Sequence, residues 1–232
     1  MCMVSMVCAV RPGRARRVVF GLVLALGCVA PALADDIREF VHETQQLVST
    51  AQQMTMVWWI PAEFWDLSMA SNPNVTPQIA QQVREAFHDY QVFALLHGNV
   101  GLQGLTDTAP RADLLANSRL QVGDKVIAPL AADQVPSGVQ AILGAMRPLL
   151  SGMLGKLGQS MELVVYPAAA GGQRLNDPKA NGAFQFVLYD QTFRWRTPLA
   201  SLLPKKVDPK SKEEFPGNYL YNPYTGDRLS TM

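Results

Sequence analysis

This chain of 232 residues has few cysteines and few histidines, and its net charge is close to zero. It has three cysteines and three histidines, and its 20 Lys and Arg nearly balance 19 Asp and Glu, which leaves a net charge of +1. Because Lys and Arg form no long cluster, the sequence argues against a nucleic-acid groove. The 17 glycines and 16 prolines are too few for a collagen-like or low-complexity chain. With 48% hydrophobic residues, the composition is that of an ordinary globular protein, long enough to bury a sizeable core.

All three cysteines lie in an N-terminal segment that has the features of a secretory signal peptide. Four arginines precede an apolar run, residues 18–30, which ends in Pro-Ala-Leu-Ala before two aspartates. A basic segment, a short apolar segment and small residues before the cut are typical of such signals. The run is shorter than the roughly 20 residues of a membrane span. We therefore expect cleavage after Ala34, which leaves a mature chain, residues 35–232, with a net charge of −3 and no cysteine.

A second processing site is present within the same segment. Residues 24–28, Leu-Ala-Leu-Gly-Cys, loosely resemble a lipobox, in which Cys28 would carry lipid and become the N-terminus. Ala25 is a weak match three residues before the cysteine, so the cut after Ala34 is favoured. We expect a periplasmic or secreted protein, with a lipoprotein anchored at Cys28 as the alternative. After cleavage we expect no transmembrane span.

We divide the mature chain into a main domain, residues 35–200, and a C-terminal tail, residues 201–232. Apolar residues recur at three- and four-residue steps over 36–53, after Thr76-Pro77 and after Ser137, and this spacing predicts three amphipathic helices. Thr76 can cap the second helix and Pro77 suits its first position. Pro148 lies inside the third helix, and we expect it to kink or split that helix.

Several short segments show the composition and alternation of strands. They are residues 54–60, the segment from Gln91, the hairpin 114–122 with 125–130, and segments 161–166, 183–189 and 192–197. The last two are expected to form a hairpin across Asp190-Gln191. Because these strands are mostly linked by hairpins rather than by helices, the sequence predicts an α+β fold. We expect an antiparallel sheet with packed amphipathic helices and a short C-terminal hairpin appendage.

The tail carries the most specific pattern in the chain. Asp208, Ser211, Asn222 and Thr225 have the spacing of two C-x2-C pairs separated by ten residues. Prolines follow the first member of each pair, and Gly226 follows the last. The segment 205–229 therefore resembles a zinc-ribbon hairpin in which all four cysteine positions are replaced. The resemblance implies two turns around a short hairpin, with the metal lost, because structural zinc sites use sulfur and nitrogen ligands.

Other interpretations of the tail remain open. The same residues favour tight turns through side-chain hydrogen bonds to the backbone, so two plain turns would give the same pattern. A hard cation held by Asp208, Asn222 and Asp227 is a further alternative, although calcium takes six to eight oxygens. We expect no metal and no cofactor in this protein.

No established catalytic pattern is found. Two Glu-x-x-His motifs, Glu39 to His42 and Glu85 to His88, are the kind used by ferritin-like di-iron sites. Such a site also needs a four-helix bundle and further carboxylates, so solvated polar pairs are favoured. Serine-hydrolase, phosphate-loop and dinucleotide signatures are absent from the sequence. A catalytic site would have to combine residues that lie far apart in the chain. His97 and His88, with nearby acids, are the best candidates for such a site.

Two groups of side chains are candidates for binding. Trp58, Trp59 and Trp65 lie within eight residues of each other, and aromatic residues are enriched where proteins bind partners. Tryptophans also serve the core, and this alternative is favoured. Arg194 and Arg196 on the polar face of a strand form a candidate anion site. The sequence thus favours a non-enzymatic binding module of the cell envelope, whose partner is an envelope protein or a small ligand. An envelope hydrolase or metal-dependent enzyme is the alternative.

Overall fold

A computed structural model describes residues 31–70, 74–102 and 104–231 of the protein. The apolar run of the expected signal peptide and Cys28 therefore lie outside the described residues. The expected cut after Ala34 falls in the first turn of α1 (Pro31–Thr44). Among the described helices, none has both the length and the apolar character needed to span a membrane.

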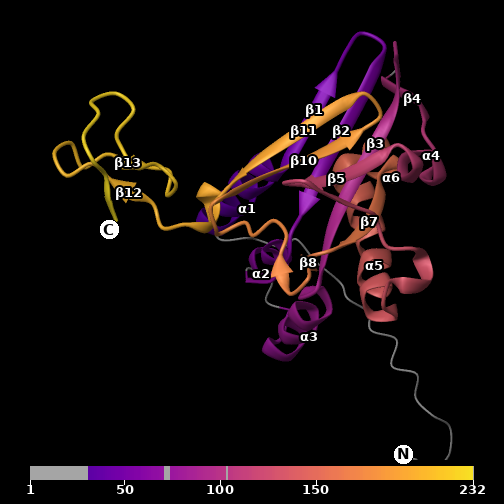
Figure 1. The fold of residues 1–232 in the computed structure, drawn as a ribbon, viewed down its shortest axis with the longest axis horizontal. Helices are drawn as coiled ribbons and strands as arrows, with labels where there is room; N and C mark the ends of the chain where they lie inside the picture. Colours follow the sequence, from indigo (N-terminus) through magenta and orange to yellow (C-terminus); the bar gives the residue numbers. More distant parts are fainter. Residues whose placement is uncertain (1–30, 71–73, 103, 232) are drawn as a thin grey trace, which may run out of the picture.

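Two antiparallel sheets and a layer of helices make up residues 31–200 (Figure 1). The large sheet has the order β1-β2-β3-β4, with β7 also paired to β3, and the small sheet has the order β11-β10-β5-β6. The large sheet contains β1 (Gln45–Ser49), β2 (Gln53–Ile60), β3 (Tyr90–Gly101), β4 (Gly104–Thr108) and β7 (Glu162–Pro167). The small sheet contains β5 (Ser118–Val122), β6 (Lys125–Ile127), β10 (Gly182–Leu188) and β11 (Gln191–Thr197). The predicted α+β class with an antiparallel sheet is confirmed.

The remaining elements cover the large sheet or follow it. The helices are α2 (Ala62–Ala70), α3 (Pro77–Phe87), α4 (Arg111–Ala116), α5 (Ser137–Leu154) and α6 (Lys156–Ser160), with 3-10 turns at Ala132–Gln134 and Ala200–Leu202. A two-stranded ribbon pairs β8 (Ala169–Ala170) with β9 (Gln173–Arg174). In the tail, β12 (Lys206–Val207), β13 (Glu214–Phe215) and β14 (Ser230–Thr231) form a separate small sheet. The tail lies to one side of the main domain in Figure 1.

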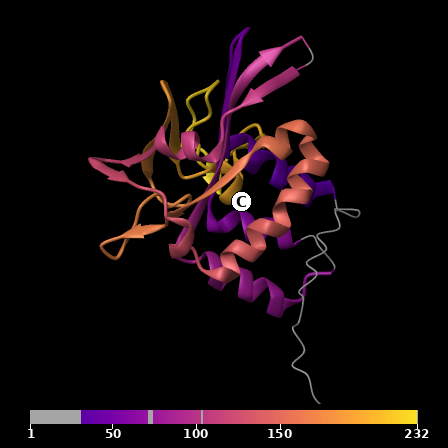
Figure 2. The same ribbon diagram turned by 90° about the vertical axis from the view of Figure 1, so that its right-hand side faces the viewer.

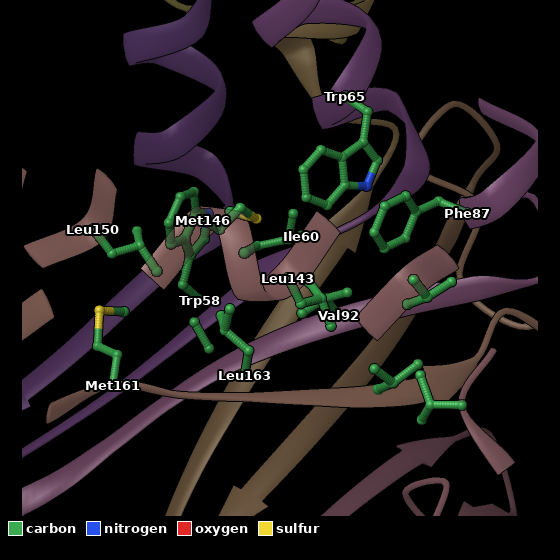
Figure 3. Close-up of a cluster of buried hydrophobic side chains, with 14 of the residues drawn as sticks. Trp58, Ile60, Trp65, Phe87, Val92, Leu143, Met146, Leu150, Met161 and Leu163 are labelled. Atoms are coloured by element: carbon green, nitrogen blue, oxygen red, sulfur yellow. The ribbon is translucent and has the colours of Figure 1, made fainter. Parts of the chain in front are cut away.

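The central strands of the large sheet, β2, β3 and β7, are buried on both faces over most of their length. One face packs against α2, α3 and α5, where Trp58, Ile60 and Val92 meet the apolar sides of the helices (Figure 3). In the view of Figure 2, these helices gather on one side of the strands. The opposite face packs against the small sheet through residues such as Trp59 and Phe93. This double burial explains why β2 is a continuous apolar run rather than an alternating one.

Helices α3 and α5 follow their predicted patterns. The Thr76 hydroxyl caps α3 by accepting the N–H of Ile79 at 3.3 Å. Helix α5 continues through Pro148, so of the two expected outcomes, a kink or a split, the split does not occur. The chain breaks instead at Gly155, whose φ of +58° lies in the left-handed region that glycine adopts without strain. Gly158 in α6 then faces the carbonyl of Leu150 so closely that no β-carbon fits between them.

Two sequence predictions of secondary structure are corrected by the structure. The helix predicted over residues 36–53 ends at Thr44, and residues 45–49 form β1, which pairs with β2. Leu47 and Val48, which the helical pattern placed on an apolar face, are exposed in that edge strand. Likewise, the first strand of the hairpin predicted over 114–122 begins only at Ser118, because α4 takes up the preceding residues. For residues 45–49, pairing with the next strand, β2, overrides a local apolar spacing.

Gln46 of β1 joins the free edges of the two sheets. Its side-chain amide donates to the carbonyl of Arg194 in β11 at 2.6 Å, and its oxygen accepts the Arg194 N–H at 3.3 Å. These are the two bonds that the backbone of a neighbouring strand would make. The side chain of a single glutamine therefore replaces a strand between β1 and β11.

We expect Gln46→Leu to lower the free energy of unfolding by about 0.5–1.5 kcal/mol, because two backbone groups of β11 lose their partner. Urea denaturation followed by tryptophan fluorescence measures this change. Arg194→Ala is the matched control, since the bonds use only the backbone of Arg194, and it should leave the unfolding midpoint nearly unchanged. Equal losses in the two variants would contradict this role for Gln46.

Candidate functional site

A pocket opens where the two sheets meet at one end of their shared core. Its cavity has a volume of about 480 Å3 and is open to solvent. It is lined by residues from four separate segments of the chain: Gln53, His97, Asn117, Tyr189 and Asp190. All five side chains are polar, although two of them are also aromatic. The pocket therefore offers hydrogen-bonding groups at the edge of an apolar interior, as ligand sites commonly do.

The strands of the large sheet place His97 at this position. His97 follows Phe93 and Leu95 on the face of β3 that packs against the small sheet, because alternate residues of a strand share a face. Thr55 of β2 lies directly opposite His97 in the register. The Thr55 hydroxyl and His97 Nδ1 are 2.8 Å apart. This hydrogen bond fixes the imidazole and directs its other nitrogen away from β2.

The turn between β10 and β11 covers the imidazole from the other sheet. Leu188 pairs with Gln191, so the turn has two residues, Tyr189 and Asp190. The expected hairpin across Asp190-Gln191 is thus displaced by one residue. Tyr189 has a φ of +54°, which is rare for a residue with a side chain and marks a position worth functional scrutiny. Its N–H donates to the carbonyl of Asn117 at 3.0 Å, and this bond holds the turn against the C-terminal end of α4.

The Tyr189 ring stacks on the His97 ring. Their centroids are 4.1 Å apart and the ring planes are inclined by 29°. Burial lowers the pKa of His97 below its ordinary value of 6.5, and this outweighs the opposite effect of the nearby Asp190 carboxylate. Burial, together with the charge of Asp113, raises the pKa of Tyr189. At neutral pH the pocket therefore presents a neutral imidazole, a protonated phenol and a carboxylate, with no Lys or Arg among its lining residues.

The lowered pKa of His97 predicts a loss of stability in weak acid. Since the unfolded chain binds a proton more readily than the folded one, the contribution of the neutral imidazole is fully present above about pH 6.5 and is lost as the pH falls through the folded-state pKa. Asp190→Asn should lower the pKa of His97 further, because a carboxylate that favours the imidazolium is removed. NMR titration of the His97 ring measures the pKa in both proteins, and urea denaturation across the same pH range measures the stability. An unchanged or raised pKa in the variant would contradict this account.

The tryptophans expected as a recognition surface are all in the interior. Trp58 and Trp65 belong to the core beneath the helices and Trp59 to the core between the sheets, with 7%, 4% and 0% of their surface exposed. The burial agrees with the favoured core interpretation and leaves no exposed tryptophan surface at these three candidate residues. Consecutive tryptophans in β2 point to opposite faces of a sheet that is covered on both sides. Arg194 and Arg196 lie exposed on β11, as expected for its polar face.

The histidines do not converge on one centre. His88 precedes β3 and contacts Asp89 at 2.7 Å, with both side chains largely exposed, whereas His97 lies near the far end of the same strand. His42 is on α1. Within residues 36–70, 74–102 and 104–231, no three His, Cys, Asp or Glu residues are grouped as a metal would need. The di-iron alternative therefore has no support in the described chain.

The first of the two tail pairs, Asp208 and Ser211, closes a turn. Asp208 Oδ1 accepts the N–H groups of Lys210 at 2.8 Å and Ser211 at 3.1 Å. The Asp208 carbonyl accepts the N–H of Lys212 at 2.9 Å, and the Ser211 hydroxyl accepts the N–H of Glu213 at 3.3 Å. Lys212 has a φ of +64°. The Asp208 N–H in turn donates to the carbonyl of Glu213 at 2.9 Å.

The second pair closes a turn with the same five bonds. Asn222 Oδ1 accepts the N–H groups of Tyr224 at 2.9 Å and Thr225 at 3.4 Å. The Asn222 carbonyl accepts the N–H of Gly226 at 2.8 Å, and the Thr225 hydroxyl accepts the N–H of Asp227 at 3.3 Å. Gly226 has a φ of +76°. The Asn222 N–H donates to the carbonyl of Asp227 at 2.8 Å.

Sequence analysis identified His97 but missed the rest of the pocket. Gln53, Asn117 and Tyr189 belong to no motif, and only the predicted turn at Asp190-Gln191 pointed to this region. Comparisons of the chain with protein-family models, with curated proteins and with solved structures found no match.

Proposed function

We propose that this protein is exported to the cell envelope and that its main domain binds a small polar ligand without catalysing its conversion. The observation that supports this function best is the pocket between the sheets, where His97 and Tyr189 stack beside the carboxylate of Asp190. Two amide side chains complete a set of groups that both donate and accept hydrogen bonds. A ligand with several hydroxyl or amine groups would satisfy them.

The charge of the pocket narrows the ligand class. Asp190 lines the pocket, the charge of Asp113 acts on Tyr189, and the lowered pKa of His97 keeps its imidazole uncharged at neutral pH. An anionic ligand would meet negative charge without a cation to offset it. We therefore expect a neutral or cationic ligand.

The hydroxyl beside His97 is poorly placed for nucleophilic catalysis. A serine- or threonine-type hydrolase needs a nucleophile that both contacts its base and reaches the substrate. Thr55 contacts His97, but only 3% of its surface is exposed. The Thr55–His97 pair therefore serves to orient the imidazole, which supports binding over hydrolysis.

NMR titration with three defined probes tests the binding proposal. N-acetylglucosamine is neutral and polyhydroxylated, choline is cationic, and inorganic phosphate is anionic. We expect saturable shifts of the His97 and Tyr189 ring signals with the first or second probe and none with phosphate. No saturable shift with either, or a response to phosphate alone, would contradict the proposal.

A pair of variants separates pocket binding from general effects. Tyr189→Gly removes the stacked ring, and glycine suits the positive φ at this position, so it should weaken binding about tenfold, the effect of losing roughly 1.4 kcal/mol of contact. Arg196→Ala, on the exposed face of β11, is the control and should bind as the unaltered protein does. Equal affinities for the two variants would place the ligand elsewhere.

Export is tested independently by expression under the protein's own N-terminal segment. We expect the mature protein in the periplasmic or secreted fraction, with Asp35 as its first residue by intact mass. A lipid-modified chain beginning at Cys28 would instead establish the lipoprotein alternative. Retention in the cytoplasm at full length would contradict export.

A further inference from the structure

The two tail turns are joined to each other through their first side chains. Asn222 Nδ2 donates to Asp208 Oδ2 at 2.6 Å, and these residues are 3% and 1% exposed. Phe215 and Leu229 are buried nearby in the same small module. A hydrogen bond from an amide to a carboxylate is stronger than one between neutral groups. Buried apolar contacts and one charge-assisted bond thus hold two matched turns together.

We infer that the tail is a metal-free ribbon in which the Asp208–Asn222 hydrogen bond takes the structural place of a zinc ion. The inference rests on the equivalence of the two turns, whose five internal hydrogen bonds correspond one to one. In each turn, side-chain oxygens at the first and fourth positions accept the same backbone N–H groups. Those four positions have the spacing of the paired ligands that hold a single tetrahedral zinc in ribbons.

The residues that occupy these positions do not fit zinc. Asn222 Oδ1 already accepts two backbone N–H groups, and Asn222 Nδ2 is a donor that cannot ligate a cation. Asp208 uses one oxygen for two backbone N–H groups and the other for Asn222. Structural zinc needs sulfur or nitrogen ligands, and here all four have been replaced by amide, carboxylate and hydroxyl groups.

A calcium-type site is equally ill matched. The second acid considered for it, Asp227, forms an ion pair with Lys210 at 2.7 Å. This pair runs from the second turn to the first and gives the module a second cross-link. Bonds from Asn222 and from two backbone N–H groups lower the pKa of Asp208, so its carboxylate stays ionised and the cross-link persists at neutral pH.

Restoring the ligands tests the inference by gain of function. The full chain carrying D208C, S211C, N222C and T225C together should bind one additional zinc per chain under reducing conditions, measured by native mass spectrometry. Cobalt substitution should give the absorption of a tetrahedral thiolate site. The unaltered full chain has the same three N-terminal cysteines and is the control. A folded variant that gains no metal would overturn the inference.

A second measurement addresses the natural sequence. If the Asp208–Asn222 bond joins the turns, N222A should speed amide hydrogen exchange of Lys210 and Ser211 in the opposite turn about tenfold or more. T225A is the matched control, because the Thr225 hydroxyl bonds only within its own turn, and it should leave those two amides nearly unchanged. Exchange that rises only in the mutated turn would overturn the inference, even if the four-cysteine variant does not fold.

Discussion

A Trp59→Ala protein should lose about 3–5 kcal/mol of unfolding free energy, the usual cost of truncating a buried aromatic residue. Trp59 is fully buried, and its ring meets Phe184 edge to face at 4.7 Å. Its indole N–H donates to Gln91 Oε1 at 3.0 Å. The same oxygen also accepts a hydrogen bond from Asn176. Trp59 therefore packs the two sheets together and takes part in a buried hydrogen-bond network around Gln91.

Urea denaturation of Trp59→Ala beside two companion variants measures this effect. Trp59→Phe keeps much of the ring volume but loses the bond to Gln91, so its loss should be smaller, about 1–3 kcal/mol. Val126→Ala, on the exposed side of β6, should stay within about 0.5 kcal/mol of the unaltered protein. If Trp59→Ala unfolded at the same urea concentration as Val126→Ala, the packing of the two sheets described above would be wrong.

Gly158→Ala should destabilise the protein by about 1–3 kcal/mol or more, as overpacking does. A β-carbon at this position would lie 1.9 Å from the carbonyl oxygen of Leu150 and 2.3 Å from its carbonyl carbon. Both atoms belong to the backbone of α5, so no side-chain rotation relieves the clash. The α5–α6 junction, or the sheet beneath it, must shift to admit the methyl group.

The same substitution at Gly144 should have the opposite sign. Gly144 lies within α5, and no neighbouring atom approaches within 4 Å of a β-carbon there. Alanine is the better helix former, so Gly144→Ala should gain about 0.5–1 kcal/mol. Thermal unfolding of the two variants is the measurement. A loss of stability at both glycines would contradict this account, because close approach to the backbone cannot explain a loss at Gly144.

The parts of the fold that the sequence predicts are those determined by local signals, such as caps, prolines and alternation of apolar residues. Thr76 and Pro77 mark the start of α3 because capping is a local effect. The run ending at Ile60 indicates a strand, since its length and its stop at Pro61 suit one. The β10–β11 hairpin is likewise evident from alternation, apart from one residue at its turn.

The errors arise where contacts between elements, rather than local spacing, decide the outcome. Leu47 and Val48 continue an α-helical spacing, but β2 offers a strand edge to pair with, and the two residues end exposed. The pocket could not be assembled from the sequence for the same reason. His97 and Tyr189 meet only because the two sheets pack face to face, and the left-handed backbone of Tyr189 is set by its bond to Asn117.

The Gln46 contact with Arg194 also bears on solubility. Strands at the margin of a sheet present unpaired N–H and C=O groups, and these can recruit the strands of another molecule into aggregates. Here one such N–H and C=O pair on β11 is already bonded within the chain, at the point where β1 and β11 approach each other. A single amide side chain thus occupies one backbone N–H and C=O pair at the margin of the small sheet, which keeps that pair from bonding to another molecule.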